Sequence, residues 1–461
     1  MSTTLQVSAL NFTLNAREFF TLIAHQPWSM LLDSGNTPHI DANVDIIVFN
    51  PSISLTTLGA NTTIVNHRDN SELISQENPF DLIQAQLKLL DLSDCPSELP
   101  FSGGALGYFS YDLARRCERL KQQSLADIAL PEMAIGIYQH AIVFDHNKEQ
   151  ISFVSRSTPQ AHQKQLNTIT KIAQKTNKLV PFHLNGDWQN QLSYAQYQDK
   201  FNRVQDYLRQ GDCYQINLTQ RFEANFTGDP YSAYLELSAQ NNTPFSAFLR
   251  LPIGAILSVS PERFIQCRAG DIQAKPIKGT MPRAQDPKQD SENAKLLVNS
   301  EKDRSENLMI VDLLRNDIGR CAQPGSVTVP KLFDIESFKN VHHLVSTVQA
   351  KLPRNASPLE LLKGAFPGGS ITGAPKIRAM DIIDELEPHR RTIYCGSIGY
   401  ISADHQMDTN ITIRTLLCLE DKVYCWAGGA IVADSNVKAE YQECFDKVAS
   451  ILPVLSLTKE K

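Results

Sequence analysis

Lys278 is the residue whose surroundings in this sequence most favour chemistry. It lies in the segment Gln273–Thr280, between an apolar residue and a Gly-Thr pair. Pro276 fixes its own φ angle and Gly279 can adopt a positive one, so the backbone can turn tightly beside the ammonium group. Burial at such a turn lowers the pKa of a lysine and makes the neutral, nucleophilic amine available. The alternative is a solvated lysine after a strand, which is the commoner environment of this residue type.

Carboxylates stand three residues apart in two segments with helical patterns. Asp303 and Glu306 form the first pair, and Glu440 and Glu443 form the second. Residues at this spacing share one face of a helix, so each pair can present two carboxylates together. Either both faces are simply solvated, or the pairs supply a Mg²⁺ site that leaves coordination positions for an anionic substrate. Another carboxylate, Glu262, follows a strand pattern shortly before the Lys278 turn.

A glycine-rich loop, Phe366–Lys376, leads into a further helical pattern. Gly368 and Gly373 have the spacing of a phosphate-binding loop, but Ala374 stands where that motif needs its lysine. A nucleoside triphosphate site is therefore not expected. The loop could instead hold a carboxylate at the N-terminus of the helix that follows.

The elements that must position these groups can be read from the hydrophobic pattern. Up to about residue 185 the chain reads as a mixture of helices and strands, and its polar composition near residues 180–192 predicts a boundary between regions 1–185 and 186–461. The expected helices span residues 79–90, 194–209, 291–317, 375–385 and 435–452, and the expected strands include 45–50, 134–146, 212–222, 245–251, 254–260, 394–402, 408–419 and 422–432.

Composition excludes several classes of protein. The 461 residues are 42% hydrophobic and 20% charged, as in ordinary globular proteins, and the formal net charge of -6 argues against a general nucleic-acid binder. No apolar run approaches the length of a membrane span, and the first residues do not resemble a signal peptide. Nine scattered cysteines without a Cys-x-x-Cys pair favour reduced thiols, and hence a cytoplasmic location.

Taken together and in this order, five motifs resemble the chorismate-utilising enzymes. They are Pro276–Thr280, Glu306–Leu313 with Arg315–Asp317, Phe366–Lys376, Ile411–Thr415 and Glu440–Glu443. The resemblance spans nearly the whole chain. It implies an α+β fold of two large packed antiparallel sheets flanked by helices, with the active site in region 186–461. It also implies a Mg²⁺ ion bound through Glu306 and Glu443, with Glu440 and Asp303 nearby.

Within that family, the chain is most similar to the branch that makes 4-amino-4-deoxychorismate for p-aminobenzoate and folate synthesis. Anthranilate-forming enzymes typically have alanine where this chain has Lys278. The resemblance implies that Lys278 attacks C2 of chorismate while Glu262 protonates the departing C4 hydroxyl, and that ammonia then expels the lysine. Water-using relatives have a lysine where this chain has Gln215, and a neutral amide cannot act as that base.

Further residues are implied as substrate contacts, with Gly428 and Gly429 as backbone donors to a carboxylate. This group comprises Gln215, His343, Thr372, Lys376, Tyr400, Arg414, Gly428 and Gly429. The family usually has a third glycine where this chain has Ala430, which would strain the backbone if that position needs a positive φ.

The resemblance also implies binding partners. Segments 31–34 and 242–246 are similar to tryptophan-binding elements of the family, which makes Ser34, Pro244, Phe245 and Ser246 candidate tryptophan contacts. The alternative is that both are plain core segments. The chain has no nucleophilic cysteine motif of its own for glutamine hydrolysis, so a separate glutamine amidotransferase subunit is expected to supply ammonia. Two other functions stay open, namely anthranilate synthesis and a non-catalytic regulatory subunit that binds chorismate or tryptophan.

Overall fold

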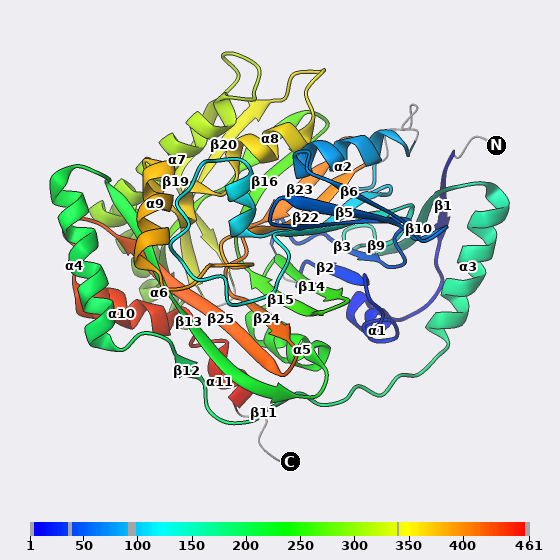
Figure 1. The fold of residues 1–461 in the computed structure, drawn as a ribbon, viewed down its shortest axis with the longest axis horizontal. Coiled ribbons are helices and arrows are strands. Elements are labelled where there is room, and N and C mark those ends of the chain that lie inside the picture. Colours follow the sequence, from blue (N-terminus) through cyan, green and yellow to red (C-terminus); the bar gives the residue numbers. More distant parts are fainter. Residues whose placement is uncertain (1–3, 36–38, 91–97, 339–340, 457–461) are drawn as a thin grey trace.

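Two large antiparallel sheets, packed face to face and flanked by helices, form the molecule (Figure 1). The computed structural model describes residues 4–35, 39–90, 98–338 and 341–456. This architecture confirms the predicted α+β fold.

The first sheet has 13 strands. Across the sheet they run in the order β1 (Thr4–Ala9), β10 (Gln150–Ser157), β9 (His140–Asp145), β3 (Val44–Val48), β2 (Met30–Asp33), β14 (Phe245–Leu251), β15 (Gly254–Ser260), β24 (Thr415–Leu419), β25 (Lys422–Ile431), β13 (Gln215–Thr227) and β11 (His183–Leu184), while β12 (Gln189–Asn190) and β21 (Gly373–Ala374) also pair with β13.

The second sheet has 12 strands. Their order is β18 (Ile277–Pro282), β20 (Val341–Lys351), β17 (Asp271–Ala274), β16 (Arg263–Arg268), β23 (Met407–Asn410), β22 (Ser397–Ser402), β7 (Gly104–Phe109), β8 (Met133–Tyr138), β4 (Ile53–Leu58), β5 (Asn61–Asn66) and β6 (Ser71–Ser75), while β19 (Thr328–Ser337) pairs with β20.

Helices lie outside the two sheets, and in Figure 1 the long helices α3 and α4 lie at opposite ends of the molecule. The α-helices are α1 (Ala16–Thr21), α2 (Pro79–Lys88), α3 (Pro159–Ala173), α4 (Tyr194–Gln210), α5 (Pro230–Asn241), α6 (Pro287–Asn299), α7 (Glu301–Gly319), α8 (Pro358–Ala365), α9 (Lys376–Leu386), α10 (Val437–Asp446) and α11 (Leu452–Ser456), and the 3₁₀ helices are η1 (Tyr111–Arg116) and η2 (Gly369–Ile371).

Central strands of the first sheet, such as β3 and β15, bury both of their faces. Ile46 belongs to the core between the sheets, whereas its neighbour Ile47 belongs to the core under helices α1, α5 and α11. The same alternation places Ile256 in the first core and Leu257 in the second. Successive side chains of a strand point to opposite faces, so a continuous apolar run is the expected pattern for such a strand.

Two predicted strands each prove to be two strands that belong to different sheets. Residues 134–146 form β8 and β9, and residues 408–419 form β23 and β24. Between β23 and β24 the chain crosses from the second sheet to the first, and Arg414 has a positive φ of 50° there. The single-strand predictions were wrong because both members of each pair are buried, and apolar patterning does not mark the crossing point.

The predicted helix 291–317 is interrupted at Ser300. This residue ends α6 and caps α7, where its hydroxyl accepts a hydrogen bond from the Asp303 N–H at 3.3 Å. The predicted helix 435–452 is also shorter, because α10 ends at Asp446. By contrast, α4 ends at Gly211, which has φ 79° as the sequence suggested.

Both sheets contain strands from each side of residue 185. Strand β2 pairs with β14 in the first sheet, and β7 pairs with β22 in the second. The division into regions 1–185 and 186–461 stays a prediction. Among the described residues, no helix is long and apolar enough to cross a membrane.

Candidate active site

Lys278 lies on an irregular part of β18, at the edge of the second sheet. The pairing of β18 with β20 shifts register between Ile277 and Thr280, and Gly279 has φ 81°. A Cβ atom on Gly279 would lie 2.8 Å from Cγ of Asp303. The turn expected from the sequence is therefore present, and only glycine allows α7 to approach it this closely.

A cavity of about 550 Å³ opens beside this turn. Its walls come from distant segments, namely β13, β18, α7, β20, η2, β25 and α10. Eight of the residues named as candidates line it, and they are Glu262, Lys278, Asp303, Glu306, His343, Arg414, Gly428 and Glu443. The fold thus brings together groups that lie up to 181 residues apart in the sequence (443 − 262).

Ser370 links Lys278 to Glu262. Its carbonyl oxygen accepts a hydrogen bond from Lys278 Nζ at 3.2 Å, and its hydroxyl donates to Glu262 Oε1 at 3.1 Å. Glu262 is 6% exposed and Lys278 is half-buried. One serine in the glycine-rich loop therefore holds the amine and the carboxyl group on either side of itself.

Burial shifts the pKa values of both groups toward their neutral forms. It raises the pKa of Glu262 to about 7, although the Lys278 ammonium and the Ser370 hydroxyl oppose the rise. It lowers the pKa of Lys278, with Glu306 and Glu262 opposing. A protonated carboxyl group beside a neutral amine is the combination that a general acid and a nucleophile require.

Arg414 and His343 supply polar groups at the wall formed by β20 and the crossing segment. Burial lowers the pKa of Arg414, and its guanidinium forms no ion pair with the described residues. His343 bonds Thr280 Oγ1 through Nδ1 at 2.8 Å, and burial lowers its pKa to about 4. A half-buried guanidinium without an acidic partner among the described residues is suited to an anionic ligand.

Carboxylates from α7 and α10 lie at the cavity, where Glu306 and Glu443 line it and Glu440 does not. Glu306 lies on α7, and Glu440 and Glu443 lie on α10. A Cβ atom on Gly429 would lie 2.9 Å from Glu443 Oε1 and 3.1 Å from Glu440 Oε2. Glu440 Oε2 is buried and has no hydrogen-bond partner among the described residues.

The charges around these carboxylates differ. Burial raises the pKa of Glu306 and that of Glu440. Burial also opposes ionisation of Glu443, but Lys447, whose Nζ lies 2.7 Å from Glu443 Oε1, outweighs it and lowers that pKa. Lys447 therefore partly neutralises the acidic group before any ligand is bound.

Besides Gly429, four predicted substrate contacts do not line this cavity. Thr372 donates its hydroxyl to Gly368, and Lys376 pairs with Asp317 at 2.6 Å. Gln215 is fully buried in β13, and neither polar atom of its side chain has a partner among the described residues. The fourth residue, Tyr400, lines a different cavity.

That second cavity, of about 200 Å³, contains all four candidate tryptophan contacts. Ser34, Pro244, Phe245 and Ser246 line it together with Tyr400. The cavity leaves both readings of these segments open, as a tryptophan pocket or as core segments beside a cavity. Gly429 lies against the carboxylates of α10. Ala430 lines the active-site cavity and does not have a positive φ, so the backbone strain considered for this position is absent.

Several lining residues were not singled out from the sequence for this site. Ser370, Lys302 and Lys447 are the most important of them. Lys447 follows Glu443 by four residues, a spacing that signals an ion pair on a helix and could have identified it. Ser370 gave no such signal, because its role depends on a carbonyl and a hydroxyl placed by the fold.

Comparisons with known proteins agree with this geometry. The family model described as chorismate binding enzyme matches residues 29–453. Aminodeoxychorismate synthase component 1 of Salmonella typhimurium is 52% identical over 95% of each chain, and that of Escherichia coli is 51% identical over 95% of this chain and 96% of its own. The crystal structure of anthranilate synthase component I from Streptococcus pneumoniae superposes with a TM-score of 0.80 at 31% identity, covering 90% of this chain and 93% of its own.

Proposed function

The chain belongs to the chorismate binding enzymes, and from this premise we propose that it converts chorismate and ammonia to 4-amino-4-deoxychorismate. The observation that carries the proposal is Lys278, held in the cavity by Ser370 next to a buried Glu262. Identity to aminodeoxychorismate synthase component 1 also exceeds identity to the superposed anthranilate synthase. A subunit that only bound chorismate or tryptophan would need neither a nucleophile nor an acid.

The proposed reaction uses Lys278 and Glu262 in turn. Lys278 Nζ forms a bond to C2 of chorismate, both ring double bonds shift (C1=C2 to C1=C6 and C5=C6 to C4=C5), and the C4–O bond breaks. Glu262 gives its proton to that oxygen, which leaves as water. Ammonia then bonds to C4, the two double bonds shift back, and the C2–N bond breaks, which returns the lysine. Two substitutions through a covalent intermediate replace one difficult displacement.

Substrate binding is proposed to depend on charge complementarity. Chorismate is a dianion, and the Arg414 guanidinium can hold one carboxylate with two parallel hydrogen bonds. His343, whose lowered pKa keeps it neutral near pH 7, can donate or accept a hydrogen bond without adding charge. Thr372, Lys376, Gln215 and Tyr400 would act on the substrate only through neighbouring groups, and their roles stay predictions.

We further propose that Mg²⁺ binds to the carboxylates of α7 and α10. The chemistry of the donors supports the ion, since Glu306 and Glu443 line the cavity and the buried Glu440 Oε2 has no hydrogen-bond partner among the described residues, although the three carboxylates are not gathered within ligand distance of one another. Oxygen ligands of this kind suit Mg²⁺. When bound, the ion would neutralise negative charge at a substrate carboxylate. Glycine at position 429 keeps the space beside Glu440 and Glu443 free of a side chain.

Calorimetric titration with Mg²⁺ tests this site without relying on turnover. Glu440→Gln should weaken Mg²⁺ binding by about 10-fold or more. The matched control is Glu236→Gln, which should leave Mg²⁺ binding unchanged. Glu236 is a half-exposed residue on α5 and does not line the cavity. Equal affinities of the two variants would count against a Mg²⁺ site at α10.

Ammonia is proposed to come from a separate glutamine amidotransferase subunit. The similar proteins carry the name component 1, which supports a partner. Association can be tested by a pull-down with that subunit in the presence of chorismate and glutamine, where no complex at all would argue against it. The cytoplasmic location expected from the cysteine pattern stays a prediction.

The smaller cavity is proposed to bind tryptophan. Ser34, Pro244, Phe245 and Ser246 converge there and support the idea. Calorimetric titration with tryptophan and mass analysis of the purified protein test it. If the protein neither carries nor binds tryptophan, the proposal fails.

Product identity tests the main proposal. Purified protein is incubated with chorismate, Mg²⁺ and ammonium salt, and the products are separated and weighed. The expected product keeps the enolpyruvyl group and has an amine in place of the C4 hydroxyl. Anthranilate plus pyruvate would instead indicate the sister reaction.

A further inference from the structure

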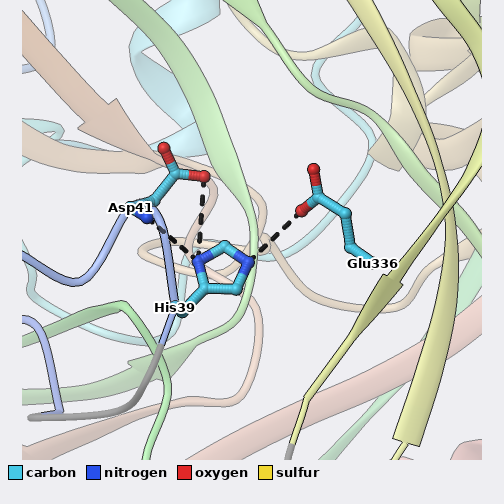
Figure 2. Close-up of side chains that lie close together, drawn as sticks. All are labelled: His39, Asp41 and Glu336. Carbon is cyan, nitrogen blue, oxygen red and sulfur yellow. Dashed lines mark hydrogen bonds and ion pairs between the residues drawn. The ribbon is translucent and has the colours of Figure 1, made fainter.

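A group of charged side chains lies behind the active-site cavity, outside the machinery described above. His39, Asp41 and Glu336 converge there from the loop before β3 and from β19, with His39 between the two carboxylates (Figure 2). The Asp41 N–H donates to His39 Nδ1 at 3.2 Å, and His39 Nε2 lies 3.3 Å from Glu336 Oε2.

This group resembles a metal site in composition, but a lysine already supplies its cation. Lys275 Nζ lies 2.8 Å from Asp41 Oδ2 and 2.6 Å from Glu336 Oε1. An ammonium between two carboxylates neutralises the charge that would attract a metal ion. The group is therefore an ion-pair cluster whose members hold one another in place.

Asp41 also holds a second cation through its other oxygen. Asp41 Oδ1 lies 2.7 Å from Arg263 Nη1, while Oδ2 binds Lys275. Arg263 directly follows Glu262, and Lys275 precedes Lys278 by three residues. One carboxylate thus joins the two backbone segments that carry the proposed acid and the proposed nucleophile.

We propose that Asp41 is a positioning residue that sets the separation of Glu262 and Lys278. The inference rests on the proposed function, because it assigns Asp41 to the reaction of those two groups. Arg263 and Asp41 are nearly buried, with side chains 4% and 13% exposed, so water does not compete strongly for this bridge. A loop near the N-terminus therefore governs the geometry of residues more than two hundred positions later.

Because of neighbouring contacts, the Asp41 bridge can be removed without unfolding the protein. Arg263 keeps a two-point contact with Asp408 at 2.9 and 3.0 Å, and Lys275 keeps Glu336. Removing the charge of Asp41 leaves each cation with one carboxylate. Asp41→Asn should therefore fold, while the charged bridge between the two segments is lost and only the β16–β17 pairing and the longer Arg263–Gln273 contact at 3.4 Å still join them.

The test measures kcat and KM for chorismate at saturating ammonium, together with the melting temperature. The matched control is Asp127→Asn, because Asp127 also lies between two basic side chains, with Arg221 at 2.8 Å and His389 at 2.9 Å, but does not line the active-site cavity. Asp41→Asn should lower kcat by about 10- to 100-fold with KM changed less than about twofold, since a misplacement near 1 Å has a cost of this size. Asp127→Asn should stay within about twofold of wild type in both constants.

Asp41→Glu is the conservative variant. It keeps a carboxylate within reach of both cations and should restore kcat to within about fivefold of wild type. A kcat for Asp41→Asn equal to that of Asp127→Asn would overturn the proposal. A rise in KM that accounts for the whole loss would also overturn it, because Asp41 would then act on binding.

If Asp41→Asn does not accumulate as folded protein, Lys275→Met replaces it in the test. This variant breaks the same bridge and leaves Asp41 paired with Arg263, so the same changes in kcat and KM are expected of it. Product analysis of the wild-type protein separates this inference from the proposed function. A wild-type protein that makes no 4-amino-4-deoxychorismate refutes the function. A productive wild type with a fully active Asp41→Asn refutes only the role of Asp41.

Discussion

At the scale of single residues, Lys278 should be indispensable because its amine is the proposed nucleophile. Lys278→Ala and Lys278→Arg should both lower the rate of product formation on the order of 10³-fold or more. Arginine retains the positive charge but is not deprotonated in proteins, so it separates nucleophilicity from charge. Steady-state rates with chorismate and ammonium check this, and an active Lys278→Arg variant would mean that only the charge matters.

Ionisation of Glu262 should make the reaction slower at alkaline pH. Burial raises its pKa to about 7, and the proposed acid is protonated below that pH and ionised above it. We expect kcat/KM for chorismate to fall as the pH rises through about 7. Glu262→Gln cannot donate a proton and should lose about 10²- to 10⁴-fold in kcat. The measurement is kcat/KM for chorismate over a series of pH values. A Glu262→Gln variant with the same rate and the same fall at alkaline pH as the wild type would rule out this role.

The sequence identified residues whose chemical type and motif are both distinctive. Lys278, Glu262, Arg414 and Glu443 line one cavity, as the motifs suggested. Ser370 and Asp41 escaped notice because an isolated serine or aspartate carries no local signal. Their significance depends on which backbone oxygen or distant cation the fold places within about 3 Å, and only hydrogen-bond geometry shows that.

At the scale of single elements, the bulge in β18 should matter to the active site more than to stability. Gly279 and Gly270 both have φ 81°, but a Cβ atom on Gly270 would meet nothing within 4 Å. Gly279→Ala would press on Asp303 and Leu297, whose side-chain atoms lie 2.8 Å from the new Cβ. Gly270→Ala should cost about 1 kcal/mol in the free energy of unfolding, and Gly279→Ala should cost more because it adds these close contacts to the same backbone strain.

Activity distinguishes the two glycine variants. Only Gly279→Ala should lower kcat, by about 10-fold or more, because Lys278 is its neighbour. Chemical denaturation and steady-state kinetics provide the two measurements. Equal kcat values for both variants would show that the bulge does not position Lys278.

Element boundaries were predictable where a residue type enforces them and not elsewhere. Gly211 ends α4 as expected, because a left-handed residue is needed there. Ser300 interrupts a helical pattern without altering its apolar spacing, since serine also occurs inside helices. The chain crosses from one sheet to the other after Tyr138 and after Asn410, inside apolar runs. The hydrophobic pattern of the sequence does not mark such crossings.

At the scale of the whole molecule, both sheets depend on strands from each end of the chain. Leu31 pairs with Phe248 across β2 and β14, and Gly107 pairs with Gly399 across β7 and β22. Such pairings could not be derived from local patterns, because sequence periodicity specifies an element and not its partner. The resemblance to a family supplied the two-sheet arrangement that the patterns alone did not.

This interdependence predicts the behaviour of a fragment. Residues 186–461 alone would expose the edges of β14 and β22 that now pair with β2 and β7. Unpaired edges promote association, so the fragment should aggregate and show no cooperative thermal transition. Circular dichroism and size-exclusion chromatography check this. A monomeric fragment with a sharp transition would instead support an independent domain after residue 185.

The most direct test of the central claim is the mass of the peptide that contains Lys278 after brief mixing with chorismate and Mg²⁺ without ammonium. Quenching at a series of times should trap an adduct on Lys278 equal to chorismate less one water, and ammonium added before the quench should discharge it. Lys278→Arg should carry none. A wild-type protein that turns over with ammonium yet shows no adduct at any quench time would contradict covalent catalysis by Lys278.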